Sequence, residues 1–256
     1  MGEQISFKSN DNTKALLDLE ELKARCGKCN LRELCLPVGL TQNDMERLDQ
    51  VIRKRQRVEK GALLYRQYDS FTCLYAVRLG HFKTYQVTHD GAQHITGFQM
   101  AGEILGLDAI NSGKHQCDAK ALEDSEVCEI HFAELQKLFA EMPALLRQFQ
   151  RLMSQEITRD QSIMLLLGNM TADQRFAAFL VNLSSRYAAR GYSGTSIQLR
   201  MGREEIGDYL GLTIESISRV ITRFKKAGLL EVANRELLIL DLPRMRNLAA
   251  GAQLVA

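Results

Sequence analysis

The chain contains 256 residues, of which 45% are hydrophobic and 25% are charged, and its formal net charge is +2. This composition suffices for one large or two modest globular domains. It argues against a membrane protein, because no run approaches about 18 uninterrupted apolar residues, and the polar start, Met1 to Lys14, lacks the apolar centre of a signal peptide. We therefore expect a soluble, cytoplasmic protein.

The polar segment before residue 40 holds three closely spaced cysteines, Cys26, Cys29 and Cys35. Cytosolic thiols are kept reduced, so this spacing indicates metal binding or redox chemistry rather than disulfides. We expect residues 1–39 to wrap around a bound group.

Residues 51–131 consist of short runs rich in Val, Ile, Leu, Phe and Tyr, separated by glycines. Examples are residues 74–77, 82–88 and 95–98. Strands at this spacing predict an antiparallel barrel or sandwich, which we place at residues 40–141. We expect Cys73 to be a small core residue of one strand. Cys117 follows the polar stretch 112–116, which predicts a partly exposed thiol.

A long helix without glycine is predicted from Ala144 to Leu167, within a segment at residues 142–169. Its apolar residues follow a heptad pattern that favours pairing with the same helix of a second chain, although packing on its own domain is the alternative. The expected dimer interface contains Leu146, Met153, Ile157, Met164 and Leu167.

Asp160 occupies the same seam, at the heptad position of Leu146, Met153 and Leu167. In a two-fold dimer its carboxylate would approach its own copy, and like charges at short range repel. The repulsion predicts a marginal dimer, as a switch requires. Neutralisation by Arg159 is the alternative.

The last segment, residues 170–256, carries 12 Lys and Arg against 8 Asp and Glu, which suits a polyanionic partner. Residues 202–224 are typical of a helix-turn-helix. Gly211 allows the tight turn, and Thr213 is a suitable N-cap for a second helix that ends at Lys226. The runs 229–232 and 237–240 predict a hairpin beside it, which makes the motif winged.

The second helix has one apolar and one polar face. The apolar stripe, which we expect to be buried, consists of Ile217, Val220, Ile221 and Phe224. The opposite face can enter a major groove, where Arg reads guanine, Glu accepts from cytosine and Ser serves either role. It contains Glu215, Ser218, Arg219 and Thr222. We therefore predict binding of double-stranded DNA.

A barrel, a long helix and a winged helix-turn-helix in this order resemble the CRP/FNR superfamily of bacterial transcription regulators, and the resemblance covers nearly the whole chain. Within it the chain is similar to FNR, the oxygen-responsive branch. The similarity rests on Cys26-x2-Cys29-x5-Cys35, on Val127-Cys128-Glu129-Ile130, and on the stretches 95–98, 152–154 with 156–157, and 211–219.

The resemblance implies a [4Fe-4S] cluster on Cys26, Cys29, Cys35 and Cys128. Thiolates suit such a cluster: one loop can supply three, and a distant fourth ties the loop to the fold. The spacing alone leaves a structural zinc site open. Leucines 31, 34 and 36 are expected to shield the cluster.

The resemblance also implies a homodimer that forms when the cluster is intact under anaerobic conditions. Its base contacts would come from Glu215, Ser218 and Arg219, with Thr213 and Thr222 on the same surface, at an inverted repeat of TTGAT-type half-sites. Such a regulator activates or represses genes of anaerobic metabolism. Activation requires contact with RNA polymerase, for which the turn at 89–92 is a candidate. Ala92 replaces an acidic residue common in the family and puts that contact in doubt.

Two other functions remain to be weighed. Cyclic-nucleotide sensors of this architecture present an Arg-Ser pair to the phosphate, but after Gly102-Glu103 this chain reads Lys114-His115-Gln116-Cys117. The Cys-x-x-Cys of Cys26 and Cys29 permits a redox enzyme, yet no thioredoxin-like βαβ pattern surrounds it. We expect a regulator rather than an enzyme.

Overall fold

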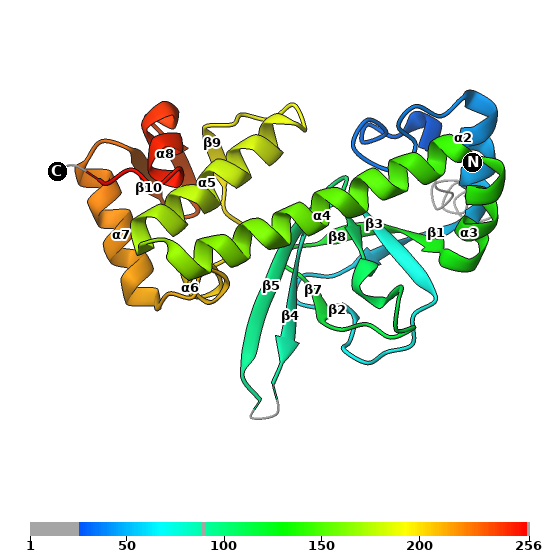
Figure 1. The fold of residues 1–256 in the computed structure, drawn as a ribbon, viewed down its shortest axis with the longest axis horizontal. Coiled ribbons are helices and arrows are strands. Elements are labelled where there is room, and N and C mark those ends of the chain that lie inside the picture. The colour runs from blue at the N-terminus through cyan, green and yellow to red at the C-terminus, as the bar shows by residue number, and fades with distance from the viewer. Residues whose placement is uncertain (1–25, 89–90, 255–256) are drawn as a thin grey trace, which may run out of the picture.

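The computed structural model describes residues 26–88 and 91–254, and residues 1–25, 89–90 and 255–256 lie outside that description. The predicted cysteine segment at 1–39 and the turn at 89–92 are therefore only partly within it. Figure 1 shows a β-domain and a C-terminal helical domain that are joined by one long helix. In the described ranges no helix is long and apolar enough to cross a membrane.

The β-domain is a jelly-roll sandwich of two four-stranded antiparallel sheets. In one sheet the order is β1 (Ile52–Val58), β8 (Ser125–His131), β3 (Cys73–Leu79) and β6 (Ile104–Leu105); in the other it is β2 (Leu63–Tyr65), β7 (Asp118–Ala121), β4 (His81–Val87) and β5 (Gln93–Met100). The predicted β-architecture is confirmed as two sheets. Their facing apolar side chains, among them Val77, Phe82 and Val127, form its core.

Short helical elements cover one end of this sandwich. A 3-10 turn, η1 (Cys26–Lys28), precedes α2 (Gln42–Val51), which begins with a capping box between Thr41 and Asp44. A second 3-10 turn, η2 (Leu107–Ala109), follows β6. Directly after β8 the chain forms α3 (Phe132–Glu141), which leads to the long helix.

The long helix, α4 (Pro143–Asn169), spans 27 residues and crosses the molecule between the two domains. It begins with a proline in its first turn, where the missing N–H costs nothing. The first half packs Leu145 and Phe149 into the core beneath α2 and α3. Farther along, Ile157 is 54% exposed and Met164 is 73% exposed, so this half carries an apolar surface that the described part of the chain leaves open.

The C-terminal domain begins with α5 (Ala172–Ala188), followed by α6 (Arg203–Leu210) and α7 (Ile214–Lys226). The predicted wing is confirmed as β10 (Leu230–Ala233) and β11 (Glu236–Ile239). A third strand, β9 (Ser196–Gln198), and the final helix, α8 (Leu242–Ala249), were not anticipated from the sequence. Both are short and are stabilised mainly by packing within the domain.

The two domains also share apolar contacts. The β5 residues Phe98 and Met100 belong to the same buried cluster as Phe179 of α5 and Tyr209 of α6. The rings of Phe98 and Tyr209 lie 5.1 Å apart in an edge-to-face arrangement. The helix-turn-helix is therefore docked on the β-domain, close to α4.

Candidate metal centre and nucleic-acid interface

Four cysteines, three from one loop and the fourth from a distant strand, line one cavity. Cys26 and Cys29 come from η1 and the turn after it, Cys35 from the end of the same loop, and Cys128 from β8. Two tight turns curl the loop, with the Cys29 N–H donating to the Cys26 carbonyl at 3.1 Å and the Cys35 N–H to Leu31 at 3.1 Å. The sequence prediction grouped the same four residues, and the fold brings them together.

The rest of the cavity is mainly apolar, with walls from α2, β1, β3 and β8 that include Leu48, Ile52 and Ala76. Burial raises the pKa of Cys35 to about 12 and that of Cys128 to about 11, and in each case a neighbouring cysteine adds to the rise. Thiolates in this cavity therefore need a cation among them. Within the described ranges no three His, Cys, Asp or Glu residues are arranged to hold a single metal ion.

Two hydrogen bonds fix the cysteine loop to neighbouring helices. Asp49 of α2 accepts from the Cys26 N–H at 2.6 Å, and the Gln148 side-chain amide of α4 donates to the Cys35 carbonyl at 3.1 Å. Gln148 is itself 8% exposed. Neither contact was predicted from the sequence. The second one joins the loop directly to the helix with the heptad pattern.

The leucines of the loop divide into two groups. Leu31 and Leu36 line the cysteine cavity, as expected of shielding residues. Leu34 does not line it, so the prediction was wrong there. Its side chain instead lies against Gly102, where an added Cβ would come within 3.0 Å of the Leu34 Cβ. The irregular turns of the loop point Leu31 and Leu34 to different surroundings, which spacing alone did not reveal.

The remaining two cysteines are buried apart from this cavity. Cys73 is 3% exposed on β3, as predicted. Cys117 is 7% exposed, so the prediction of a partly exposed thiol was wrong. Asp108 draws the segment inward, because its carboxylate accepts from the Gln116 N–H at 2.6 Å and lies 3.6 Å from the Cys117 sulfur.

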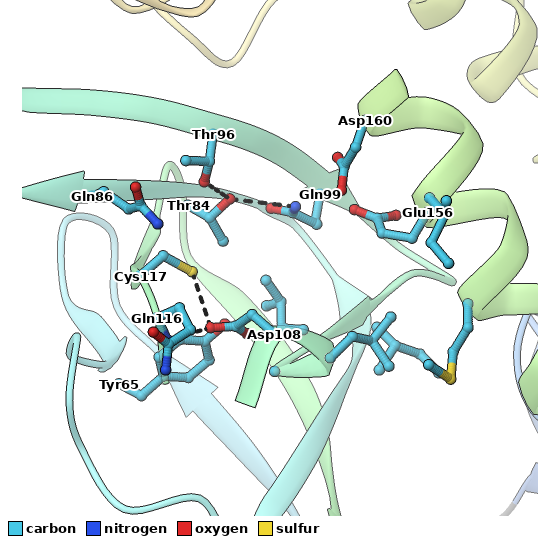
Figure 2. Close-up of a pocket in the computed structure, with 16 residues that line it drawn as sticks. Tyr65, Thr84, Gln86, Thr96, Gln99, Asp108, Gln116, Cys117, Glu156 and Asp160 are labelled. Carbon is cyan, nitrogen blue, oxygen red and sulfur yellow. Dashed lines mark hydrogen bonds between the residues drawn. The ribbon is translucent and has the colours of Figure 1, made fainter. Parts of the chain in front are cut away.

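Cys117 faces a second cavity, of about 310 Å³, between the β-domain and α4. Figure 2 shows Thr84, Thr96 and Gln99 along one side and the carboxylates of Glu156 and Asp160 on the other. Among the residues that the structure describes, its lining includes Asp108 as a third carboxylate and contains no Lys, Arg or His. Such a cavity repels the phosphate of a cyclic nucleotide.

The candidate DNA-reading helix has the predicted ends. Gly211 adopts the left-handed conformation at φ 62°, and the Thr213 side chain caps α7 by accepting from the Ser216 N–H at 3.2 Å. The predicted apolar stripe is confirmed as buried at 5% exposure or less: Ile217, Val220, Ile221 and Phe224.

The opposite face of α7 is open to solvent. Glu215, Arg219 and Thr222 are exposed, and Ser218 is half-buried. Two hydroxyls are occupied by the helix itself, because Ser218 donates to the Ile214 carbonyl at 2.9 Å and Thr222 donates to Ser218 at 2.9 Å. The lowered pKa of Glu215, caused by hydrogen bonds from its own backbone N–H and from Thr213, keeps that carboxylate charged.

The candidate dimer residues occupy two environments. Leu146 and Met153 are half-buried, whereas Ile157, Met164, Leu167 and Asp160 are exposed. Burial against the second cavity raises the pKa of Asp160. The proposed neutraliser, Arg159, lies at 2.9 Å from Glu156 and 3.6 Å from Glu103, so its ion pairs are directed to other carboxylates.

Comparisons with known proteins match this architecture throughout. The cyclic nucleotide-binding domain family matches residues 55–142, and the Crp-like helix-turn-helix domain family matches residues 174–248. The chain is 48% identical to the transcriptional regulatory protein btr of Bordetella pertussis, over 88% of this chain and 93% of that protein. It is 43% identical to the fumarate and nitrate reduction regulatory protein of Escherichia coli, over 90% and 92%. The structure of FixK2 from Bradyrhizobium japonicum superposes with a TM-score of 0.70 at 29% identity, over 78% of this chain and 98% of that one.

Proposed function

The chain belongs to the CRP/FNR family of DNA-binding transcription regulators, and we propose that it is an oxygen-responsive member holding a [4Fe-4S] cluster on Cys26, Cys29, Cys35 and Cys128. The observation that carries this proposal is the single cavity into which three segments bring these four thiols. We also propose the four-part division into residues 1–39, 40–141, 142–169 and 170–256.

Four thiolates would suit either a [4Fe-4S] cluster or a structural zinc ion. The similarity of the cysteine spacing to that of the FNR branch favours the cluster. Burial of Cys35 and Cys128, together with the apolar walls, would shelter that group from solvent.

When bound, the cluster would supply sensitivity to oxygen, because its loss leaves the cysteine loop without a common attachment point. The loop is fixed to α4 through Gln148 and to α2 through Asp49. An altered loop would therefore act on the helix that carries the exposed apolar seam. We propose that the ordered loop favours dimerisation and that the disordered loop favours the monomer.

Dimerisation would provide the second half of the DNA contact. One copy of α7 reads one half-site, and a two-fold dimer places two copies about one DNA turn apart. We propose that Glu215, Ser218 and Arg219 read bases of a TTGAT-type half-site in an inverted repeat, with Thr213 and Thr222 beside them. The regulated genes would belong to anaerobic metabolism, and activation would require RNA polymerase.

The test of the cluster is anaerobic purification followed by analysis of iron, acid-labile sulfide and zinc. We expect about four irons and four sulfides per chain and a brown protein whose visible absorption fades in air. A colourless protein with one zinc per chain would contradict the proposal. It would then support a zinc-stabilised DNA-binding protein.

Asp160 provides a separate prediction about the dimer. Asp160→Ala should dimerise in air, because it removes a carboxylate that meets its own copy at the seam. The titratable groups near it are Glu156 and Arg159 on α4 and the neutral phenol of Tyr209 on α6. Sedimentation in air should show a dimer for the variant and a monomer for the parent chain.

The pH dependence of the dimer distinguishes charge repulsion from a packing effect. A second carboxylate nearby raises the pKa of Asp160 further in the dimer, so the dimer binds more protons than two monomers. Dimerisation of the parent chain should therefore be stronger at low pH and weaken as pH rises through that raised pKa. Asp160→Ala should lose most of this dependence; an unchanged dependence would contradict the repulsion.

A further inference from the structure

A buried cluster of one glutamate and three arginines joins the two domains to the long helix. Glu103 lies in the turn between β5 and β6, and its side chain is 13% exposed. Arg159 belongs to α4, whereas Arg186 lies on α5 and Arg190 in the turn that follows it. The arginine side chains are 19%, 13% and 6% exposed. The Glu103 carboxylate of the β-domain thus pairs with guanidinium groups from α4 and from the C-terminal domain.

The contacts of Glu103 are short and complementary. Arg186 donates through Nε at 2.9 Å and through Nη2 at 2.6 Å, one bond to each carboxylate oxygen. Arg190 donates at 2.8 Å, and Arg159 lies at 3.6 Å. The carboxylate also accepts from the Met100 N–H at 3.0 Å, which fixes its position in the turn.

The arginines are tied to the β-domain by their remaining donors. Arg186 donates to the Phe98 carbonyl at 2.6 Å, and Arg190 donates to the Ala101 carbonyl at 2.5 Å. Both guanidinium groups therefore face inward and are not presented to DNA. Burial by itself raises the pKa of Glu103, but the three guanidinium groups outweigh it and hold that pKa at about 2.

Neutralising Glu103 would leave an unbalanced charge. Glu156, which lies 2.9 Å from Arg159, would then be the one carboxylate described next to three positively charged arginines. Buried guanidinium groups without a counter-charge repel one another and cannot recover their hydration. The domain contact is then expected to open, although each domain keeps its own apolar core.

We propose that Glu103 is a positioning residue, which holds the helix-turn-helix in one orientation relative to the β-domain and α4. In this orientation the reading face of α7 is exposed and α6 rests on β4 and β5. Lys83 of β4 contacts Glu205 at 2.7 Å, and the Ile95 N–H of β5 donates to Asp208 at 2.6 Å. The orientation is therefore compatible with DNA binding. Because the helix-turn-helix already has this orientation before DNA binds, less conformational entropy is lost on binding in each half of a dimer.

The position of Leu34 suggests what the orientation responds to. Leu34 of the cysteine loop packs directly on Gly102, a residue with φ +90° that precedes Glu103. A change in the loop would therefore reach the turn that holds the arginines. This second step rests on the proposed function of the cysteine loop, whereas the positioning role of Glu103 does not.

The positioning role is tested by ¹⁵N relaxation on the aerobically isolated chain. Glu103→Gln keeps the side-chain shape and removes the charge. We expect residues 174–248 of this variant to tumble faster than the β-domain, whereas the parent chain tumbles as one body. Asp118→Asn is the matched control: its carboxylate accepts from the Gln67 N–H at 2.6 Å within the β-domain. It should behave as the parent chain does.

DNA binding provides the functional readout. In anaerobic dimers Glu103→Gln should weaken specific binding at least about tenfold, with the dimerisation constant unchanged. A variant that tumbles as one body and binds as tightly as Asp118→Asn would overturn the proposal. If Glu103→Gln does not fold, Arg186→Gln takes its place, with the same expected results and the same contradicting result.

Hydrogen exchange of the Met100 amide tests the step through Leu34, because that N–H is bonded to Glu103. We expect slower exchange in the anaerobic protein than after exposure to air. Equal exchange in the two states would overturn this step. The relaxation measurement needs no bound cluster. It therefore tests the positioning role of Glu103 even if the chain proves to hold no cluster.

Discussion

Cys128→Ser should abolish both iron retention and specific DNA binding. The serine hydroxyl is a poor ligand for iron, and Cys128 on β8 is the ligand that would connect the cysteine loop to the β-domain. Without it the loop would keep only the cysteines within its own ten residues. Binding to the inverted repeat should fall to the nonspecific level, a decrease of about 10³-fold or more. Iron analysis and an anaerobic mobility-shift titration measure the two effects.

Cys73→Ser is the matched control for this variant. Cys73 is buried on β3, in the sheet that also contains Cys128, but it does not line the cysteine cavity. Both substitutions replace a half-buried or buried thiol by a hydroxyl. The control should keep its iron and its DNA affinity, with at most a modest loss of stability. Equal iron content in both variants would contradict the assignment of Cys128.

Arg219→Ala should produce the second large effect. Arg219 is exposed on the reading face of α7, whose opposite face is anchored by Phe224 and Val220 in the core. A bidentate contact from arginine to guanine contributes about 1–3 kcal/mol per half-site, and the dimer would lose it twice. The titration should show weakened binding to the TTGAT-type repeat and little change on DNA of unrelated sequence.

A matched variant separates base reading from loss of positive charge. Arg246 is exposed on α8, away from the reading face of α7, and Arg246→Ala removes the same charge. It should weaken binding to both DNA sequences slightly and equally. Comparable losses of specificity in the two variants would show that Arg219 contributes charge alone. If Arg219 instead reads guanine, substitution of that guanine should weaken binding by the parent chain and have no further effect on Arg219→Ala.

The helix-turn-helix was predictable because its determinants are local. Gly211 permits the turn, Thr213 caps the helix, and the apolar stripe repeats with the helical period. The strands around Gly80 and Gly91 followed from similar short-range signals. The smaller elements β9 and α8 escaped prediction. The three residues of β9 carry almost no periodicity, and α8 lies outside the two-helix pattern that revealed α6.

The prediction of the four candidate cysteine ligands could not be made from local sequence pattern alone. Three lie within ten residues and are visible as a motif, but Cys128 was joined to them through a family resemblance. The pairing of β8 with β1 and β3 is what places it beside the loop. The opposite outcomes for Leu31 and Leu34 arise in the same way, because the face to which each side chain points depends on the turns of the loop.

By itself the sequence determined the order of the β-domain, the long helix and the helix-turn-helix, the apolar and polar faces of α7 and the heptad pattern of α4, since each depends on spacing within a few helical turns or strands. Only the tertiary structure decided which distant groups meet. Glu103 and Arg186 are 83 positions apart and show no shared pattern, yet they form a buried ion pair. Such a pair exists only after the domains dock, because burial supplies both the need for a counter-charge and the geometry that provides it.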